Sequence, residues 1–131
     1  MNIPATAKTH EIPGSTIWLD ENGILFSISS KTPPQNVEEA KEALVMLQRY
    51  LGEGRKVCML IDVTNTSETT REMRNFAAEE LPKIVKAIAL VSQSVLGKML
   101  ANLFFSLKSQ PYPVKYFNNE TDAQQWLKQY L

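Results

Sequence analysis

Residues 55–69 read RKVCMLIDVTNTSET, and this segment indicates the architecture of the chain. The run from Val57 to Ile61 is too short for a typical helix, and it is apolar on both faces of a strand. Such a strand lies inside a sheet that is covered above and below. The strand closes at Asp62, where a series of hydroxyl and amide side chains begins. The segment therefore predicts a central β-strand that leads into a polar loop.

The residues before this strand predict a β-hairpin and then a helix. Ser15 to Leu19 and Ile24 to Ser29 are apolar stretches on either side of Asn22-Gly23, which is a strong signal of a tight hairpin turn. After two prolines, apolar residues recur at the spacing of one helical face, namely Val37, Ala40, Leu44, Leu47 and Leu51. Gly52 and Gly54 end this helix before the central strand begins.

The residues after the polar loop predict a second helix and a second buried strand. Thr69 and Glu72 have the spacing of a capping box, in which the hydroxyl and the carboxylate each bind a backbone amide at the helix start. Pro82 has no amide hydrogen to donate inside a helix, so the helix stops near Leu81. The apolar residues 87–91 then predict a buried strand.

Another helix, a strand and a final helix complete the chain. Ser94 can cap the third helix, whose inner stripe we expect at Leu96, Met99, Leu100, Leu103 and Leu107. The last strand covers 114–117, after the segment Pro111-Tyr112-Pro113. Asn118 or Asn119 can cap the final helix, which presents Ala123, Trp126, Leu127 and Tyr130.

This order, β-β-α-β-α-β-α-β-α, predicts one α/β domain over residues 1–131 with a mixed five-stranded sheet and flexible residues 1–13. Strands joined by helices are parallel, and their crossovers are right-handed. If each parallel strand is added beside the previous one, these crossovers place successive helices on the same face. The other face then needs cover from a further helix or from a second copy of the chain, so a homodimer is also expected.

Composition excludes several classes of function. The 14 basic and 14 acidic residues balance, so no net field attracts the chain to nucleic acid or to an anionic membrane. No long hydrophobic span or signal-peptide pattern occurs in the sequence, which predicts a cytoplasmic protein without membrane insertion. The sole cysteine, Cys58, lies in the apolar central strand and is expected to act as a small hydrophobic residue.

The polar loop is the first candidate site. Ligands of open parallel sheets collect at the carboxyl ends of the strands, where loops lead into helix starts. We expect six polar residues of the loop at this edge of the sheet, namely Asp62, Thr64, Asn65, Thr66, Ser67 and Thr69. Ser94 and Lys98 follow the next strand and are expected at the same edge. A phosphate or carboxylate can bind at a helix start. The alternative is that these side chains only cap helices and complete turns.

Catalytic and metal chemistry find little support in the sequence. His10 is the sole histidine and lies in the N-terminal segment, so no Ser-His or Cys-His pair with a fixed geometry is available. One histidine and one cysteine do not build a zinc site, and no glycine-rich phosphate loop occurs. The sequence therefore predicts a protein that is not an enzyme and uses no cofactor or metal.

Phe105 departs from the expected pattern of the third helix. With the inner stripe centred on Leu96, Leu100 and Leu103, its ring points about half a turn away from the core. Either the segment around Tyr112 covers this ring, or the ring forms an interface or the wall of an apolar site.

The order of elements resembles that of the STAS domain, a family that includes the anti-sigma-factor antagonists of the SpoIIAA type. The stretches 60–65, 71–80, 86–90 and 113–117 look like those of a bacterial STAS-like branch without an assigned function. The resemblance implies a SpoIIAA-like fold and a regulatory domain that binds a protein partner. Antagonists of this type carry a phosphorylated serine in an Asp-Ser-Ser-Gly segment at the second helix, and this chain lacks that glycine.

Two functions remain open after this comparison. The first is a non-enzymatic interaction domain that docks a partner through residues 62–69 and through Arg71 and Arg74, with Ser67 as the first candidate for phosphorylation. The second is a module for a small anion, an apolar small molecule or a lipid, with an apolar pocket walled by Phe104, Phe105 and Tyr112 beside the polar loop.

Overall fold

The computed structural model describes residues 1–106 and 110–131. Its sheet contains the strands β1 (His10–Ile12), β2 (Ser15–Leu19), β3 (Leu25–Ser29), β4 (Val57–Asp62), β5 (Val85–Val91) and β6 (Val114–Phe117). The helices are α1 (Val37–Leu51), α2 (Arg71–Glu80), α3 (Val95–Ser106) and α4 (Glu120–Leu127), with 3-10 turns at Leu81–Lys83 and Lys128–Tyr130. The α/β architecture with a mixed sheet is therefore as predicted.

The described strands form a six-stranded sheet in the order β1-β2-β3-β4-β5-β6, which is also their order along the chain. β1, β2 and β3 pair antiparallel, and β3 to β6 pair parallel. The prediction of five strands is wrong, because it omitted β1. This strand has only three residues and lies at the sheet edge, so it carries no alternating pattern that a sequence reading could detect.

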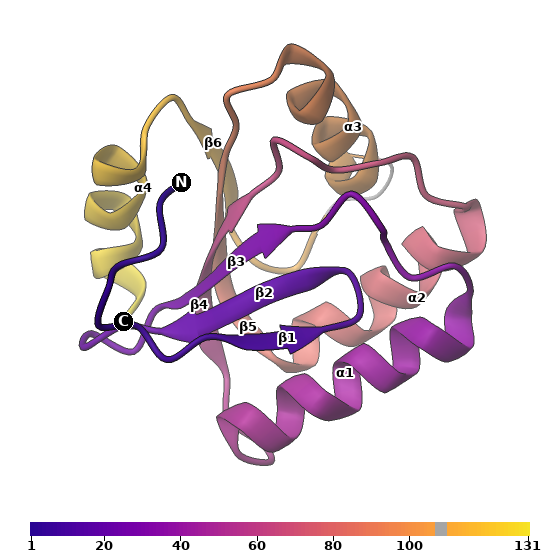
Figure 1. Cartoon of the computed structure of the whole chain (residues 1–131), viewed down its shortest axis with the longest axis horizontal. Helices are drawn as coiled ribbons and strands as arrows, with labels where there is room; N and C mark the ends of the chain where they lie inside the picture. The colour runs from indigo at the N-terminus through magenta and orange to yellow at the C-terminus, as the bar shows by residue number, and fades with distance from the viewer. Residues whose placement is uncertain (107–109) are drawn as a thin grey trace.

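The helices divide between the two faces of the sheet. Figure 1 shows α1, α2 and α3 on one side of the sheet and α4 on the other. Right-handed crossovers between adjacent parallel strands place α1, α2 and α3 on the same face. The sequence left open whether a helix or a second copy of the chain covers the opposite face, and in the structure α4 covers it. The reason for expecting a homodimer is thereby removed, and the homodimer itself stays a prediction.

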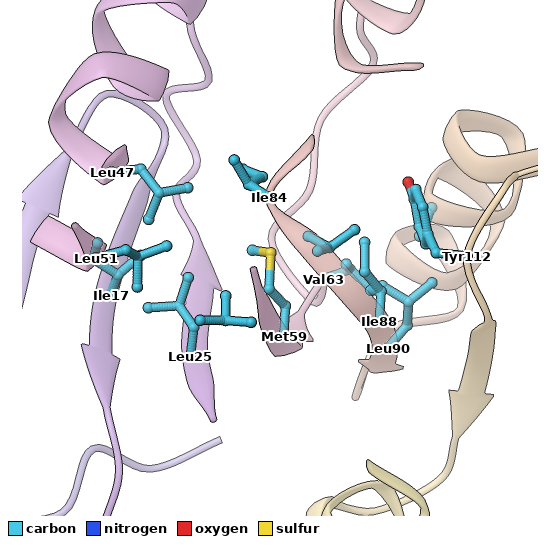
Figure 2. Close-up of a cluster of buried hydrophobic side chains, with 13 residues drawn as sticks. Ile17, Leu25, Leu47, Leu51, Met59, Val63, Ile84, Ile88, Leu90 and Tyr112 are labelled. Carbon is cyan, nitrogen blue, oxygen red and sulfur yellow. The ribbon is translucent and has the colours of Figure 1, made fainter. Parts of the chain in front are cut away.

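Each face has its own hydrophobic core. On the α1–α3 face, Leu47 and Leu51 of α1 pack with sheet residues such as Leu25 and Met59, as Figure 2 shows. On the α4 face, Trp18 and Phe26 belong to a second cluster that includes residues of the sheet and of α4: Cys58, Leu60, Ala87, Ala89, Val91, Ala123 and Leu127. As predicted, β4 and β5 are therefore buried on both faces.

Helix ends follow the capping residues closely. Asn36 and Asn119 accept hydrogen bonds from the amides of Glu39 and Asp122 at the starts of α1 and α4. At α2 the cap is Thr70, whose hydroxyl accepts from the Met73 amide at 3.1 Å, so the capping box predicted at Thr69 is wrong by one residue. Two consecutive threonines offer the same hydroxyl, and only the backbone geometry distinguishes them.

The orientation of α3 differs most from the prediction. The predicted inner stripe is wrong at Leu96, Met99 and Leu103, which are exposed. Leu100 is half-buried, and Leu107 lies outside the described residues. The buried side of α3 is formed by Gly97 and Ala101, with Phe105 packed against the core. A Cβ on Gly97 would collide with the Val63 carbonyl oxygen. The close approach that this glycine permits selects the inner side of the helix.

Candidate functional site

The candidate site begins with an apolar cavity between the sheet and helices α1, α2 and α3. Its volume is about 300 Å³, which lies at the lower end of the range of ligand sites. Leu44 and Leu47 of α1, Met73 and Phe76 of α2, and Phe104 of α3 contribute to its lining. The cavity therefore interrupts the packing of the α1–α3 face with an apolar space.

One end of the cavity is polar. Ser15 and Ser29 are register partners in β2 and β3, and both line the cavity together with Ser30, Thr66 and Ser67. These residues lie where the parallel strands β3 and β4 end, which is the edge at which open parallel sheets bind ligands. The site therefore combines an apolar interior with hydroxyl groups at the carboxyl edge of the sheet.

A second cavity of about 210 Å³ adjoins the first. The two share the lining residues Thr66, Ser67, Thr69 and Phe104, and the second also contacts Arg74. The Arg74 Nη1 donates a hydrogen bond of 2.6 Å to the Thr69 carbonyl, whereas its Nε is buried without a hydrogen-bond partner among the described residues. A cationic group therefore lies next to the hydroxyl groups.

The first half of the polar loop is used for internal contacts. Asp62 is buried, and its Oδ1 accepts hydrogen bonds from the Thr64 amide at 2.9 Å and the Thr64 hydroxyl at 2.6 Å. Its Oδ2 forms a 2.8 Å ion pair with the N-terminal ammonium of Met1. The Thr64 hydroxyl also accepts from the Gln93 amide at 3.0 Å, which joins the loops after β4 and β5.

The pKa of Asp62 reflects this network. Burial alone raises the pKa of the carboxyl group, but the hydrogen bonds from the N-terminal ammonium and from Thr64 outweigh burial and hold the pKa below its ordinary value. The nearby Glu120 has the opposite shift, because burial and the charge of Asp62 raise its pKa more than the N-terminal ammonium lowers it. Asp62 therefore stays ionised as a structural anchor.

The second half of the loop has hydroxyl groups without internal partners. The side chains of Thr66, Ser67 and Thr69 are half-buried, and across residues 1–106 and 110–131 none of them forms a hydrogen bond to another group. All three line both cavities. The structure thus brings together the part of the predicted site that follows Asn65.

Other predicted site residues lie elsewhere. Ser94 accepts a hydrogen bond of 3.2 Å from the Gly97 amide and so caps α3. The ammonium group of Lys98 lies 4.5 Å from the centre of the Tyr116 ring, and Lys98 lines neither of the two cavities. Asn65 and Arg71 are exposed. The cation expected at the loop from Lys98 is therefore supplied by Arg74 instead.

The three predicted aromatic residues separate into two groups. Phe104 and Phe105 line the main cavity, with their ring centres 4.9 Å apart in an edge-on arrangement. Tyr112 is buried in the α1–α3 core and does not line the cavity. Burial raises the pKa of its hydroxyl group to about 12. Tyr112 therefore supports the core, and the two phenylalanines form the wall of the site.

Sequence reasoning missed the residues that leave the cavity open. Ala40 and Ala43 of α1 and Ala77 of α2 line the cavity at positions where larger side chains would fill it. Ser27 of β3 lines it as well and is buried, although the alternation of the strand predicts an apolar residue there. Small or polar residues on the inner faces of neighbouring elements are the signal that would have indicated a cavity.

Within the described residues, neither a metal-binding cluster nor the thiol of Cys58 lies at the two cavities. The described part of the chain brings together no group of three histidine, cysteine or carboxylate residues that could hold a metal ion. The thiol of Cys58 is buried on the α4 face, away from the cavity lining, and burial raises its pKa despite the opposing charge of Lys86. The site offers apolar surface, hydroxyl groups, the guanidinium group of Arg74 and the carboxyl groups of Glu68 and Glu80.

The fold and the site define an α/β domain with an apolar cavity at the carboxyl edge of a mixed sheet. The chain belongs to the family described as Domain of unknown function (DUF7793), whose model matches residues 17–131. No curated protein matches the chain. A crystal structure of a protein with unknown function from Arthrobacter sp. FB24 matches at 28% sequence identity with a TM-score of 0.32, and the match covers 86% of this chain and 97% of that chain. No helix in the described ranges has the length and hydropathy needed to cross a membrane.

Proposed function

We propose that this domain binds an apolar small molecule in the cavity between the sheet and helices α1, α2 and α3. The carrying observation is the apolar pocket of about 300 Å³, which is partly open to solvent, because a concave apolar site of this size with a few polar groups is typical of small-molecule binding. Its lining is largely apolar, and its hydroxyl groups gather at one end. This combination is typical of sites that bury most of a small ligand and orient it by a few polar contacts.

The size of the cavity bounds the ligand. A water molecule occupies roughly 30 Å³ in the liquid, and a chain carbon needs a similar space. A cavity of about 300 Å³ therefore accommodates on the order of ten carbon atoms. Both Phe104 and Phe105 line this space, which suits an aliphatic or aromatic ligand of that size.

The test uses 1-decanol as the probe and one substitution that fills the cavity. Ala77 lines the cavity, so Ala77→Leu places additional carbon atoms inside it. We expect this variant to bind 1-decanol about tenfold more weakly than the parent protein in calorimetric titration, as for added methyl groups in other apolar pockets. The same variant gains up to about 1 kcal/mol in unfolding free energy, because it fills an existing space.

The neighbouring Ala78→Leu is the matched control, because Ala78 is also half-buried on α2 but does not line the cavity. It is expected to bind 1-decanol as the parent does. Equal affinities of the two leucine variants, or no binding by the parent protein, would show that the cavity is not a ligand site.

A second candidate function is the docking of a protein partner at the second half of the loop. It is favoured by the hydroxyl group of Ser67, which has no hydrogen-bond partner within 1–106 and 110–131, by the exposed side chain of Arg71, and by the resemblance to STAS domains. Intact-mass measurement of the protein isolated from its own cells tests this candidate. An added phosphate that disappears in Ser67→Ala supports a phosphorylation switch, and an unmodified mass under all growth conditions argues against it.

A further inference from the structure

The charge of Arg74 is the feature that the apolar cavity leaves unexplained. A guanidinium group offers five N–H donors, yet the hydrogen bond of Arg74 to a described residue goes from Nη1 to the Thr69 carbonyl. The ion pairs within residues 1–106 and 110–131 involve Met1, Lys41 and Lys83, and none involves Arg74. Its Nε is also buried without a partner among the described residues, and an unsatisfied buried donor lowers the stability of the folded protein.

The surroundings of this guanidinium group suit a carboxylate. Ser67 and Thr69 line the second cavity beside Arg74, and their hydroxyl groups have no hydrogen-bond partner among the described residues. A carboxylate accepts paired hydrogen bonds from a guanidinium group, and such charged pairs are shorter and stronger than neutral ones. Hydroxyl groups can donate to the remaining lone pairs of the same carboxylate.

The carboxylates of the protein itself do not fill this role. Glu68 also lines the second cavity, but its side chain is exposed and forms no ion pair with Arg74. Glu80 lines the main cavity and pairs with Lys83 at 3.3 Å. The second cavity thus keeps a half-buried cation, whereas the negative charge beside it lies in solvent, where water screens it.

We infer that the ligand is an aliphatic carboxylic acid of about ten carbon atoms, with its carboxylate at Arg74 and its chain in the main cavity. The two cavities adjoin at Thr66, Ser67, Thr69 and Phe104, and the proposed ligand passes between these side chains from one cavity to the other. This inference rests on the proposed function and adds the chemical class of the ligand. It also assigns to Arg74 the recognition of the ligand's negative charge.

The experiment compares decanoate with 1-decanol, which has the same chain length and no charge at neutral pH. The parent protein is expected to bind decanoate at least tenfold more tightly than 1-decanol. Arg74→Gln is expected to weaken decanoate binding by roughly tenfold to a hundredfold, the loss that follows from removing a hydrogen bond to a charged group. The affinity of this variant for 1-decanol stays within about twofold of the parent value.

Two further variants separate the charge of Arg74 from its structural contacts. Arg71→Gln removes an exposed arginine from the same helix that lines neither cavity, and it leaves the affinity for decanoate unchanged. Arg74→Lys keeps the charge without the paired donors and retains part of the preference for decanoate. If Arg74→Gln does not fold, the preference of the parent for decanoate over methyl decanoate tests the same contact without any substitution.

The outcomes distinguish the inference from the function on which it rests. If the parent binds decanoate and 1-decanol equally, or if Arg74→Gln affects both alike, the assignment of the carboxylate to Arg74 is wrong, while the apolar site stands. If the parent binds neither probe, the proposed function fails as well.

Discussion

On the α4 face of the sheet, the rings of Trp18 and Phe26 stack with their centres 5.3 Å apart, and α4 closes over them. On the α1–α3 face, alanine and serine side chains line a cavity of about 300 Å³. Both faces belong to the same sheet and share its strands. The difference indicates that side chains fill the α4 face, whereas the α1–α3 face contains a space that lowers its contribution to stability. Under the proposed function, this space holds the ligand.

Polar groups show the same contrast. Asp62 lies on the same face of β4 as Cys58 and Leu60, which is the α4 face. Its carboxylate is fully engaged by Thr64 and the N-terminal ammonium. Ser67 at the cavity has a hydroxyl group without a partner in the described chain. A buried polar group that is paired adds rigidity, whereas an unpaired one is available to a ligand.

Trp18→Ala is expected to have the largest effect on stability. The Trp18 side chain is 2% exposed and pairs across the strands with Phe26, so its removal leaves a large hole in a filled core. We expect a loss of about 3–5 kcal/mol in unfolding free energy, measured by chemical denaturation.

Phe76→Ala is the matched change on the cavity side, because Phe76 is half-buried and already borders empty space. Its expected cost is about 1–2 kcal/mol, since less apolar surface returns to water. Equal costs for the two substitutions would contradict the contrast between a filled face and an open one.

Thr64→Val is expected to have the next largest effect, and the effect depends on pH. The valine keeps the shape of the side chain but cannot donate to Asp62, so we expect a loss of about 2 kcal/mol at neutral pH. The folded-state pKa of Asp62 is lowered, so this stabilisation is present above the unfolded pKa of about 4 and is lost as the pH falls through the folded pKa. The stability difference between the parent and Thr64→Val therefore shrinks in acid.

Ser67→Ala is the control from the open end of the site, where the substitution removes no hydrogen bond to any residue that the structure describes. Its unfolding free energy is expected to stay within about 0.5 kcal/mol of the parent value from neutral to acid pH. A difference for Thr64→Val that does not change with pH would show that Asp62 does not gain its stability from this hydroxyl group.

Much of the fold follows from the sequence, because its signals are local. The Asn22-Gly23 turn, the stripe of α1 and the buried run of β4 each depend on neighbouring residues, and all three appear as predicted. β1 and the inner side of α3 depend on contacts between distant segments. The approach of Gly97 to Val63 turns α3 away from the side with the most leucines, and periodicity alone does not contain that information.

The candidate site was predictable only in part for a similar reason. The carboxyl edge of the sheet was predicted as its location, because the topology of parallel strands fixes that edge. The sequence did not predict that the hydroxyl group of Thr64 bonds to Asp62 while that of Ser67 has no partner among the described residues. This difference depends on which groups the fold brings within hydrogen-bond distance. The cavity itself results from alanines on α1 and α2 that meet only after the helices pack.

The smallest effect on stability is expected for Leu96→Ser on the outer side of α3. The Leu96 side chain is 62% exposed, so its loss returns little apolar surface to water, and the expected change in unfolding free energy is within about 0.5 kcal/mol. Phe105→Ser on the inner side is the matched change, with an expected cost of roughly 2 kcal/mol, because the Phe105 ring packs against the core. If Leu96→Ser were the more costly substitution, α3 would have to present its leucines to the sheet. The wall of the cavity would then be formed by other residues.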